Sequence, residues 1–155
     1  MSITKQVKPG WFARHFPVPE PGWVAPAIAM ALIIGSAGRA QDYLTRHETG
    51  PGNPLTRGVE VAGYEVWGVL FAACAIAVLV GLLVEQLRRN RWPVLVAHCY
   101  GAGLHVTYVW VLVQEVDGSG RGVGVIMPPL AAALTHIVCI GLFAGPRVRV
   151  RKVDQ

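Results

Sequence analysis

Long apolar runs, separated by polar, basic and proline-rich stretches, organise this chain. The hydrocarbon layer of a bilayer is about 30 Å thick, so a helix needs about 20 residues to cross it. Because only helices and closed barrels satisfy their backbone hydrogen bonds in lipid, the pattern predicts an all-α integral membrane protein. The expected architecture is a bundle of four transmembrane helices in one domain, formed by the runs near residues 22–38, 63–84, 93–113 and 124–145.

The residues that flank these runs indicate where each helix begins and ends. The second run is the clearest span, because its only charge is Glu65 at one end. The first run lies near the lower length limit of about 17 residues, and its helix could continue past Gly38 as far as Leu44. Proline is tolerated in the first turn of a helix, so Pro93 and Pro128 mark the starts of the third and fourth helices.

Lysine and arginine residues concentrate on alternate connections, which predicts the orientation. They are most frequent in the tails 1–21 and 146–155 and in the turn between the second and third runs. By the positive-inside rule, both termini are expected in the cytoplasm. We expect this basic set to lie at the membrane surface and to contact anionic lipid. Its members are Arg88, Arg89, Arg91, Arg147, Arg149, Arg151 and Lys152.

Composition agrees with a membrane location and narrows the partners. Hydrophobic residues make up 53% of the chain and charged residues 15%, and the mean hydropathy is +0.44. The net charge of +5 is segregated to the edges of the spans, as membrane insertion requires, so no nucleic-acid partner is indicated. The expected partners are the lipid bilayer and either further copies of the chain or another membrane protein.

Small residues recur four positions apart along several spans. Examples are Ala31 with Gly35 in the first run and Ala77 with Gly81 in the second. Such spacing lets helix backbones approach closely in a membrane. We expect these residues to pack within the bundle, with association between protomers as the alternative.

Histidines inside the third and fourth runs are the sharpest chemical signal. If the two helices are antiparallel, His105 and His136 lie at similar depth near mid-span and could face one another. His98 lies seven residues before His105, on the same helix face, and Gly101 between them leaves space for a flat group. A bis-histidine haem, a metal ion or a proton relay would each need this arrangement. The alternative is that the histidines bond Thr107, Tyr108, Thr135 or a backbone carbonyl on a neighbouring helix.

No motif for enzymatic catalysis accompanies the histidines. The chain contains no GxSxG, HExxH or phosphate-binding glycine loop, and the spans carry acids only near their ends. Three cysteines occupy span positions and form no CxxC pair. We therefore expect a protein that acts without catalysis and without a cofactor, with a haem- or metal-binding redox subunit and an accessory structural subunit of a membrane complex as alternatives.

The overall plan resembles a group of small four-span membrane proteins encoded by phages and prophages of high-GC actinobacteria. The resemblance rests on the Arg-, Val-, Ala- and Gly-biased composition, the lead Trp11-Phe-Ala-Arg-His-Phe-Pro17, the Arg91-Trp92-Pro93 opening of the third run and the short basic tail. It covers the whole length. It implies residence in the bacterial inner membrane and a membrane-active role, either holin-like permeabilisation or superinfection exclusion, and it carries no functional residue across.

Overall fold

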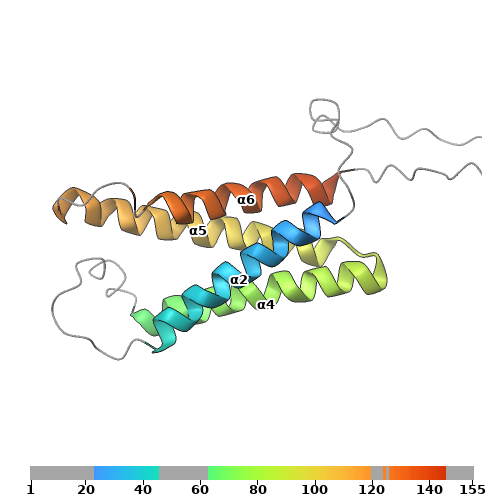
Figure 1. Cartoon of the computed structure of the whole chain (residues 1–155), viewed down its shortest axis with the longest axis horizontal. Coiled ribbons are helices and arrows are strands. Elements are labelled where there is room, and N and C mark those ends of the chain that lie inside the picture. Colours follow the sequence, from blue (N-terminus) through green and yellow to red (C-terminus); the bar gives the residue numbers. More distant parts are fainter. Residues whose placement is uncertain (1–22, 46–62, 120–123, 125, 146–155) are drawn as a thin grey trace, which may run out of the picture.

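Four helices form the part of the chain that the computed structural model describes, namely residues 23–45, 63–119, 124 and 126–145. They are α2 (Val24–Thr45), α4 (Tyr64–Arg88), α5 (Trp92–Ser119) and α6 (Met127–Ala144) (Figure 1). All four are long and apolar enough to cross a membrane. The prediction of an all-α four-helix bundle is thereby confirmed, and α2 reaches Thr45, the longer of the two ends considered for the first run.

Local sequence signals account for the helix ends. Gly63 precedes α4 with a φ of 82°, and Arg89 ends that helix in the left-handed conformation with a φ of 54°. The Asn90 side chain then accepts a hydrogen bond from the Trp92 backbone N–H at 3.2 Å, which satisfies a donor at the start of α5. Prolines occupy the first positions of α6, where a missing N–H costs nothing.

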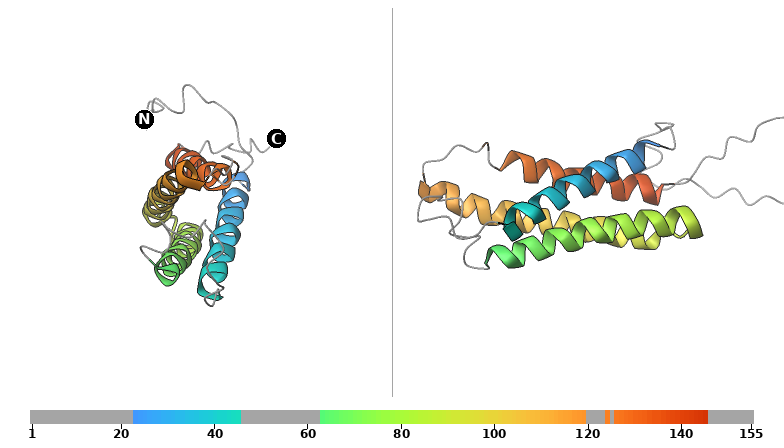
Figure 2. Two further views of the ribbon diagram at one scale, coloured as in Figure 1. Left: turned by 90° about the vertical axis from the view of Figure 1, so that its left-hand side faces the viewer. Right: turned by 60° about the horizontal axis from the view of Figure 1, so that its bottom comes forward.

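The helices run alternately up and down, so the bundle has two ends with different residues. The start of α2, the α4–α5 turn and the end of α6 share one end, here called the Arg91 end (Figure 1). The opposite end, here called the Tyr64 end, holds the end of α2 and the start of α4. α4 packs against α2 and α5, and α6 packs against α5 and less extensively against α2. α2 crosses obliquely, from beside α6 at the Arg91 end to beside α4 at the Tyr64 end (Figure 2).

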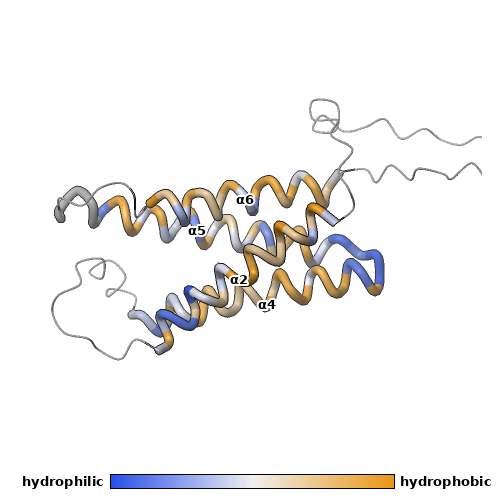
Figure 3. The backbone as a smooth tube through the Cα atoms, viewed as in Figure 1, coloured by the Kyte–Doolittle hydropathy of each residue, from blue (hydrophilic) through white to orange (hydrophobic). Residues whose placement is uncertain are grey.

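Apolar side chains lie both inside the bundle and on its outer surface. Residues such as Ile34, Ile76 and Val96 are exposed, as expected of a surface that faces lipid rather than water. The tube is hydrophobic over most of its length and hydrophilic near the α4–α5 turn and at the Tyr64 end (Figure 3). Hydropathy is thus distributed along the bundle axis as a membrane-spanning protein requires.

Two apolar clusters fill the interior. The Arg91-end cluster comprises Ala29, Leu32, Val78, Leu82, Val94, Ala97, Cys139 and Phe143. The Tyr64-end cluster comprises Ala40, Trp67, Phe71, Cys74, Leu104, Tyr108 and Leu112. Positions 98 and 136 lie between these clusters, and His105 directly follows Leu104 of the Tyr64-end cluster, so the intramembrane histidines lie near the middle of the bundle.

The small residues of the spans divide into two groups. A Cβ atom on Gly81 would lie 2.7 Å from the Cα of Val94, so this glycine permits the close approach of α4 to α5. By contrast, Gly35 has nothing within 4 Å of its Cβ position, and Ala31 is exposed. The expectation of packing within the bundle is correct for Gly81 and wrong for Gly35 and Ala31, because the latter two face outward from α2.

Candidate functional site, a buried histidine cluster

Three histidines from two helices meet in the interior of the bundle. His98 and His105 come from α5 and His136 comes from α6, with exposed fractions of 0%, 2% and 0%. The His136 ring centroid lies 5.1 Å from that of His98 and 5.2 Å from that of His105. The expected juxtaposition of His105 and His136 is therefore present, and His136 is the central member of the cluster.

His98 and His136 are joined directly by a hydrogen bond. Their Nδ1 atoms lie 2.9 Å apart, a normal length for such a bond. Because an imidazole nitrogen either donates or accepts, one ring must carry a proton on Nδ1 and the other must present a bare Nδ1. When both rings are neutral, the donor ring consequently has a bare Nε2, and the acceptor ring has an Nε2–H.

The Nε2 atoms of this pair are buried and lack hydrogen-bond partners among the described residues. One of them is therefore an unfilled donor and the other an unfilled acceptor. Buried polar atoms without partners are rare in folded proteins, and each one requires an explanation. The two unpartnered atoms therefore mark this pair as a candidate functional site.

His105 is held by its own helix. Its Nδ1 lies 2.8 Å from the carbonyl oxygen of Gly101. A carbonyl only accepts, so the Nδ1 of His105 carries the proton, and its neutral form leaves Nε2 as an acceptor. The ring also makes an edge contact with Phe71, at a centroid distance of 5.4 Å.

Gly101 provides the space that His136 occupies. A Cβ atom at this position would lie 2.6 Å from Nε2 and 2.7 Å from Nδ1 of His136. The sequence indicated room here for a flat group between His98 and His105. That flat group is the His136 imidazole itself, so the space does not remain for a cofactor.

The Nδ1 atoms of His98 and His136 leave no room for a haem iron or another metal ion between them. A metal takes imidazole nitrogens at about 2.0–2.1 Å, so two axial histidines of a haem stand about 4 Å apart. The Nδ1 atoms of His98 and His136 are closer than that and share a hydrogen bond. Across the described residues, no group of three or more His, Cys, Asp or Glu side chains could hold a metal ion.

The surrounding hydroxyls have partners other than the histidines. Thr107 and Thr135 donate to carbonyls of their own helices, Gly103 and Ala131, at 3.0 and 2.7 Å. The Tyr108 hydroxyl bonds that of Tyr43 on α2. The alternative in which threonine or tyrosine hydroxyls satisfy the histidines is therefore wrong, and only its backbone carbonyl form applies, within one helix, to His105.

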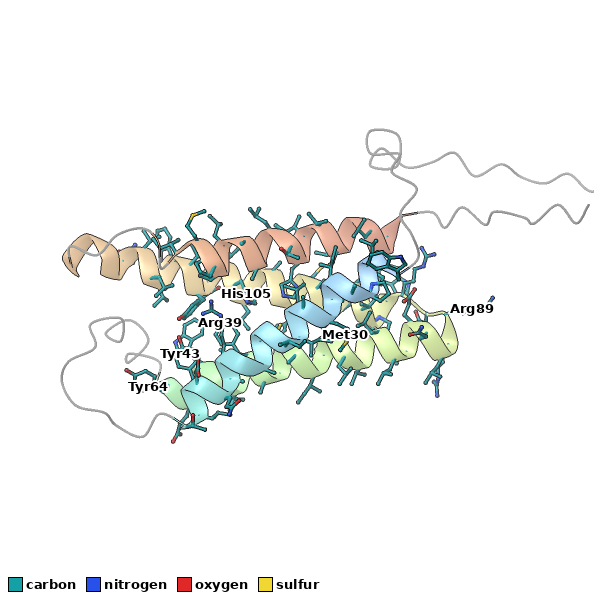
Figure 4. All side chains as sticks on the ribbon, in the orientation of Figure 1. Met30, Arg39, Tyr43, Tyr64, Arg89 and His105 are labelled. Atoms are coloured by element: carbon teal, nitrogen blue, oxygen red, sulfur yellow. The ribbon has the colours of Figure 1, made fainter. Side chains whose placement is uncertain are left out.

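Sequence reasoning missed a second group of residues near the Tyr64 end. The Arg39 guanidinium carbon lies 5.3 Å from the Tyr108 ring centroid and 5.8 Å from that of Phe71. Figure 4 shows Arg39 and Tyr43 extending from α2 into the space between the helices, on the side of His105 that faces Tyr64. A charged residue in an apolar helix is itself a functional signal, but it becomes visible only once the helix is known to continue past Gly38.

The basic residues expected at the membrane surface are only partly described. Arg88 and Arg89 are exposed. Arg91 is half-buried, and its guanidinium donates to the carbonyl oxygens of Phe143 and Gly145 at 3.2 and 2.7 Å, so at least part of its hydrogen-bonding capacity serves the end of α6. The remaining members lie outside the described residues: Arg147, Arg149, Arg151 and Lys152.

No family model, curated protein or solved structure matches the chain.

Proposed function

We propose that this chain is a proton-carrying membrane protein in which the His98–His136 pair binds protons and passes them on. The observation that supports the proposal is the Nδ1–Nδ1 hydrogen bond between two buried rings whose Nε2 atoms have no partner among the described residues. Histidine is the side chain whose ordinary proton affinity lies closest to physiological pH. Ionisable groups in membrane interiors are commonly parts of ion or proton pathways.

The pair can transfer a proton with every proton accounted for. An incoming proton binds the bare Nε2 of the donor ring, which becomes an imidazolium. The proton shared between the two Nδ1 atoms then moves to the second ring. That ring releases the proton from its own Nε2 and becomes neutral again. One proton has entered, one has left, and the two rings have exchanged tautomers, so the hydrogen bond between them must open and the starting tautomers must be restored before another proton passes in the same direction.

The packing around the pair positions the two rings for each transfer. Phe143 stacks against the His98 ring at a centroid distance of 5.5 Å and an interplanar angle of 21°. The His136 ring lies directly on the Gly101 backbone. Two rings held in this way keep their Nδ1 atoms facing each other, as positioned proton transfer requires.

Proton flux into liposomes tests the proposal. The purified protein would be reconstituted with a pH-sensitive dye inside, and a potassium gradient with valinomycin would drive proton entry. We expect flux from the wild type and a loss of at least roughly tenfold in His98→Asn and in His136→Asn, because neither variant has the proton-sharing nitrogen pair. His47→Asn, which lies outside the four described helices, is the matched control and should retain wild-type flux.

Two results would contradict the relay. If the internal pH of liposomes with wild-type protein changes no more than that of protein-free liposomes, the protein does not carry protons. Equal flux from the wild type and both span variants would show that protons move without the histidine pair. Helical content measured by circular dichroism distinguishes loss of the site from loss of the fold.

A membrane-active role is the second candidate, in the holin-like or phage-excluding form that the sequence indicated. It is supported by the outward face of α2, where Ala27, Ala31, Gly35 and Gly38 are all exposed. Nothing lies within 4 Å of a Cβ position on either glycine. Small residues spaced in this way permit the close approach of a second copy, which an oligomeric lesion would need.

Induced expression with a potential-sensitive dye tests this second candidate. Wild-type protein should depolarise the membrane, and Gly35→Leu should reduce the effect because the side chain blocks helix approach. Gly103→Leu, at an exposed and equally open position on α5, is the control. Unchanged potential, growth and phage susceptibility would count against both forms of the role. An accessory subunit role and the absence of catalysis stay predictions.

A further inference from the structure

A second polar site lies between the histidines and the Tyr64 end. Arg39 belongs to α2, six residues before its last residue Thr45, which is about 9 Å along the helix axis. Its guanidinium is turned inward against the Phe71 and Tyr108 rings rather than outward to the interface. Figure 4 shows this side chain between the helices, near His105. Arg39 is half-buried and lies close to the end that holds Tyr64.

The hydrogen-bonding groups of Arg39 are unused within the described part of the chain. Its contacts with Phe71 and Tyr108 involve the faces of the rings. A guanidinium carries five N–H donors and no acceptor, and contact with a ring face supplies none of these donors with a lone pair. Among the described residues, no carboxylate forms an ion pair with Arg39 and no oxygen accepts a hydrogen bond from it, although Asp42 lies on the same helix.

Trp67 supplies a second, independent observation in the same place. Its side chain is 4% exposed, and its Nε1–H has no hydrogen-bond partner among the described residues. The indole lies 5.2 Å from the Tyr108 ring centroid and 6.2 Å from that of Phe71. Arg39 and Trp67 therefore adjoin the same two rings, one from α2 and the other from α4.

Both unfilled groups are donors, and one of them carries a positive charge. The Trp67 N–H is a buried donor without an acceptor, which is costly. Arg39 is half-buried, and a cation within a membrane is costly without a counter-charge. A ligand that only accepts hydrogen bonds and is negatively charged removes both costs. We infer that Arg39 and Trp67, beside Phe71 and Tyr108, form a binding site for an oxyanion, meaning one carboxylate or phosphate group.

The residue types narrow the ligand further. The planar guanidinium matches the two oxygens of a carboxylate or phosphate, which it binds through a pair of parallel N–H···O bonds. Cations and ligands that only donate hydrogen bonds are excluded because the unfilled groups offer no acceptor. The oxyanion could come from a soluble molecule that enters at the Tyr64 end or from a lipid headgroup at that interface. This site stands on its own contacts and does not depend on proton transfer by the histidines.

Isothermal titration calorimetry in a maltoside detergent, which contains no phosphate, tests the inference. One arm titrates inorganic phosphate into the purified full-length protein, with sodium chloride of equal ionic strength as the reference. The other arm adds phosphatidylglycerol to the micelles. We expect saturable binding in at least one arm. We expect it to weaken roughly tenfold or more in Arg39→Gln, which removes the charge and the fork, and less in Arg39→Lys, which keeps the charge.

Further variants keep the test decisive. Trp67→Phe retains the ring and removes the N–H donor, so it should also weaken binding, whereas Arg88→Gln, which is exposed at the opposite end, should not. Saturation with phosphate identifies a soluble oxyanion, and saturation with phosphatidylglycerol alone identifies a headgroup. No binding in either arm, equal binding of chloride, or equal affinity in folded Arg39→Gln would overturn the site.

Discussion

Gly101 has two roles, one that depends on the absence of a side chain and one that depends on the position of its backbone carbonyl. Its α-carbon leaves the space that the His136 ring occupies, and its carbonyl oxygen accepts the hydrogen bond from His105. A methyl group here would overlap the His136 imidazole, so α5 and α6 would have to move apart to accommodate it. The residue therefore links the positions of two histidines to one peptide unit.

We predict that Gly101→Ala displaces His136 and destabilises the bundle by about 1–3 kcal/mol, the usual cost of overpacking a tightly packed interior. The midpoint temperature of thermal unfolding in detergent and the proton flux into liposomes should both fall. Gly103→Ala is the matched control, because nothing lies within 4 Å of its Cβ position, and it should match or exceed wild-type stability. Equal stability of the two variants would show that α5 and α6 do not pack as described.

The hydrogen bonds of the three histidine rings predict their tautomers, and this prediction can be tested without measuring proton transport. Nitrogen NMR on isotope-labelled histidine, in membranes at a pH where the rings are neutral, should show Nδ1 protonated in His105. Of His98 and His136, one should be the Nδ1–H form and the other the Nε2–H form. Single His→Asn variants assign the signals. Two Nε2–H rings at positions 98 and 136 would be incompatible with the hydrogen bond between them.

The depth of each histidine along its helix could be predicted from the sequence, but the rotation of each helix about its own axis could not. Counting residues from the ends of two antiparallel spans placed His105 and His136 at one level, and they do meet. The direct partner of His136 is nevertheless His98. The spans are apolar on all sides, since lipid and bundle interior both favour such residues, so the pattern does not show which face is buried.

The end of α2 lies beyond the apolar run that predicted this helix. The first apolar run stops near Gly38, yet α2 continues to Thr45 because Arg39 and Tyr43 find partners on α4 and α5. The starts of α4, α5 and α6 lie within three residues of the predicted starts, where glycine and proline mark them, whereas α4 and α5 end at Arg88 and Ser119, four and six residues beyond the predicted ends. The site around Arg39 was missed because it lies in the part of α2 whose end was left open.

The end of α6 illustrates how a basic residue joins two elements. Arg91, in the α4–α5 turn, donates to the carbonyl oxygens of Phe143 and Gly145, which have no partners of their own within a helix end. We predict that Arg91→Ala destabilises the protein by about 1.5–3 kcal/mol, the usual range for hydrogen bonds from a charged donor. Detergent-induced unfolding measures the effect. Arg88→Ala, at an exposed position of α4, should change stability little, and an equal loss in both would contradict the specific role of Arg91.

At the scale of the whole molecule, the up-and-down order fixes which ends of helices share a side of the membrane. The Arg91 end contains Asn90, and the Tyr64 end contains the exposed Gln114 at the limit of the apolar part of α5. The charge distribution of the sequence predicts that the Arg91 end faces the cytoplasm. The arrangement of the helices is independent of that orientation, so the two can be tested separately.

Cysteine labelling tests the orientation. In a background where Cys74, Cys99 and Cys139 are replaced by alanine, Asn90→Cys and Gln114→Cys each place one reactive thiol at an end of the bundle. We predict that a membrane-impermeant maleimide labels Gln114→Cys in intact spheroplasts and Asn90→Cys only after permeabilisation. Labelling of the two on the same side would contradict the described spans, and the reverse pattern would contradict only the orientation.

The Arg91-end cluster separates the histidines from one aqueous phase. Between His98 and that end lie Leu82, Val94 and Phe143, with the buried Glu85 side chain nearer the end. The opposite direction contains the Tyr64-end cluster, which Arg39 and the Tyr43 and Tyr108 hydroxyls interrupt with polar groups. Water enters apolar layers reluctantly, so under the proposed function we expect protons to reach the histidines more readily from the Tyr64 end, where these polar groups interrupt the apolar packing. In this conformation the bundle would report the acidity of that single compartment, and transfer across the membrane would require the helices at the Arg91 end to part.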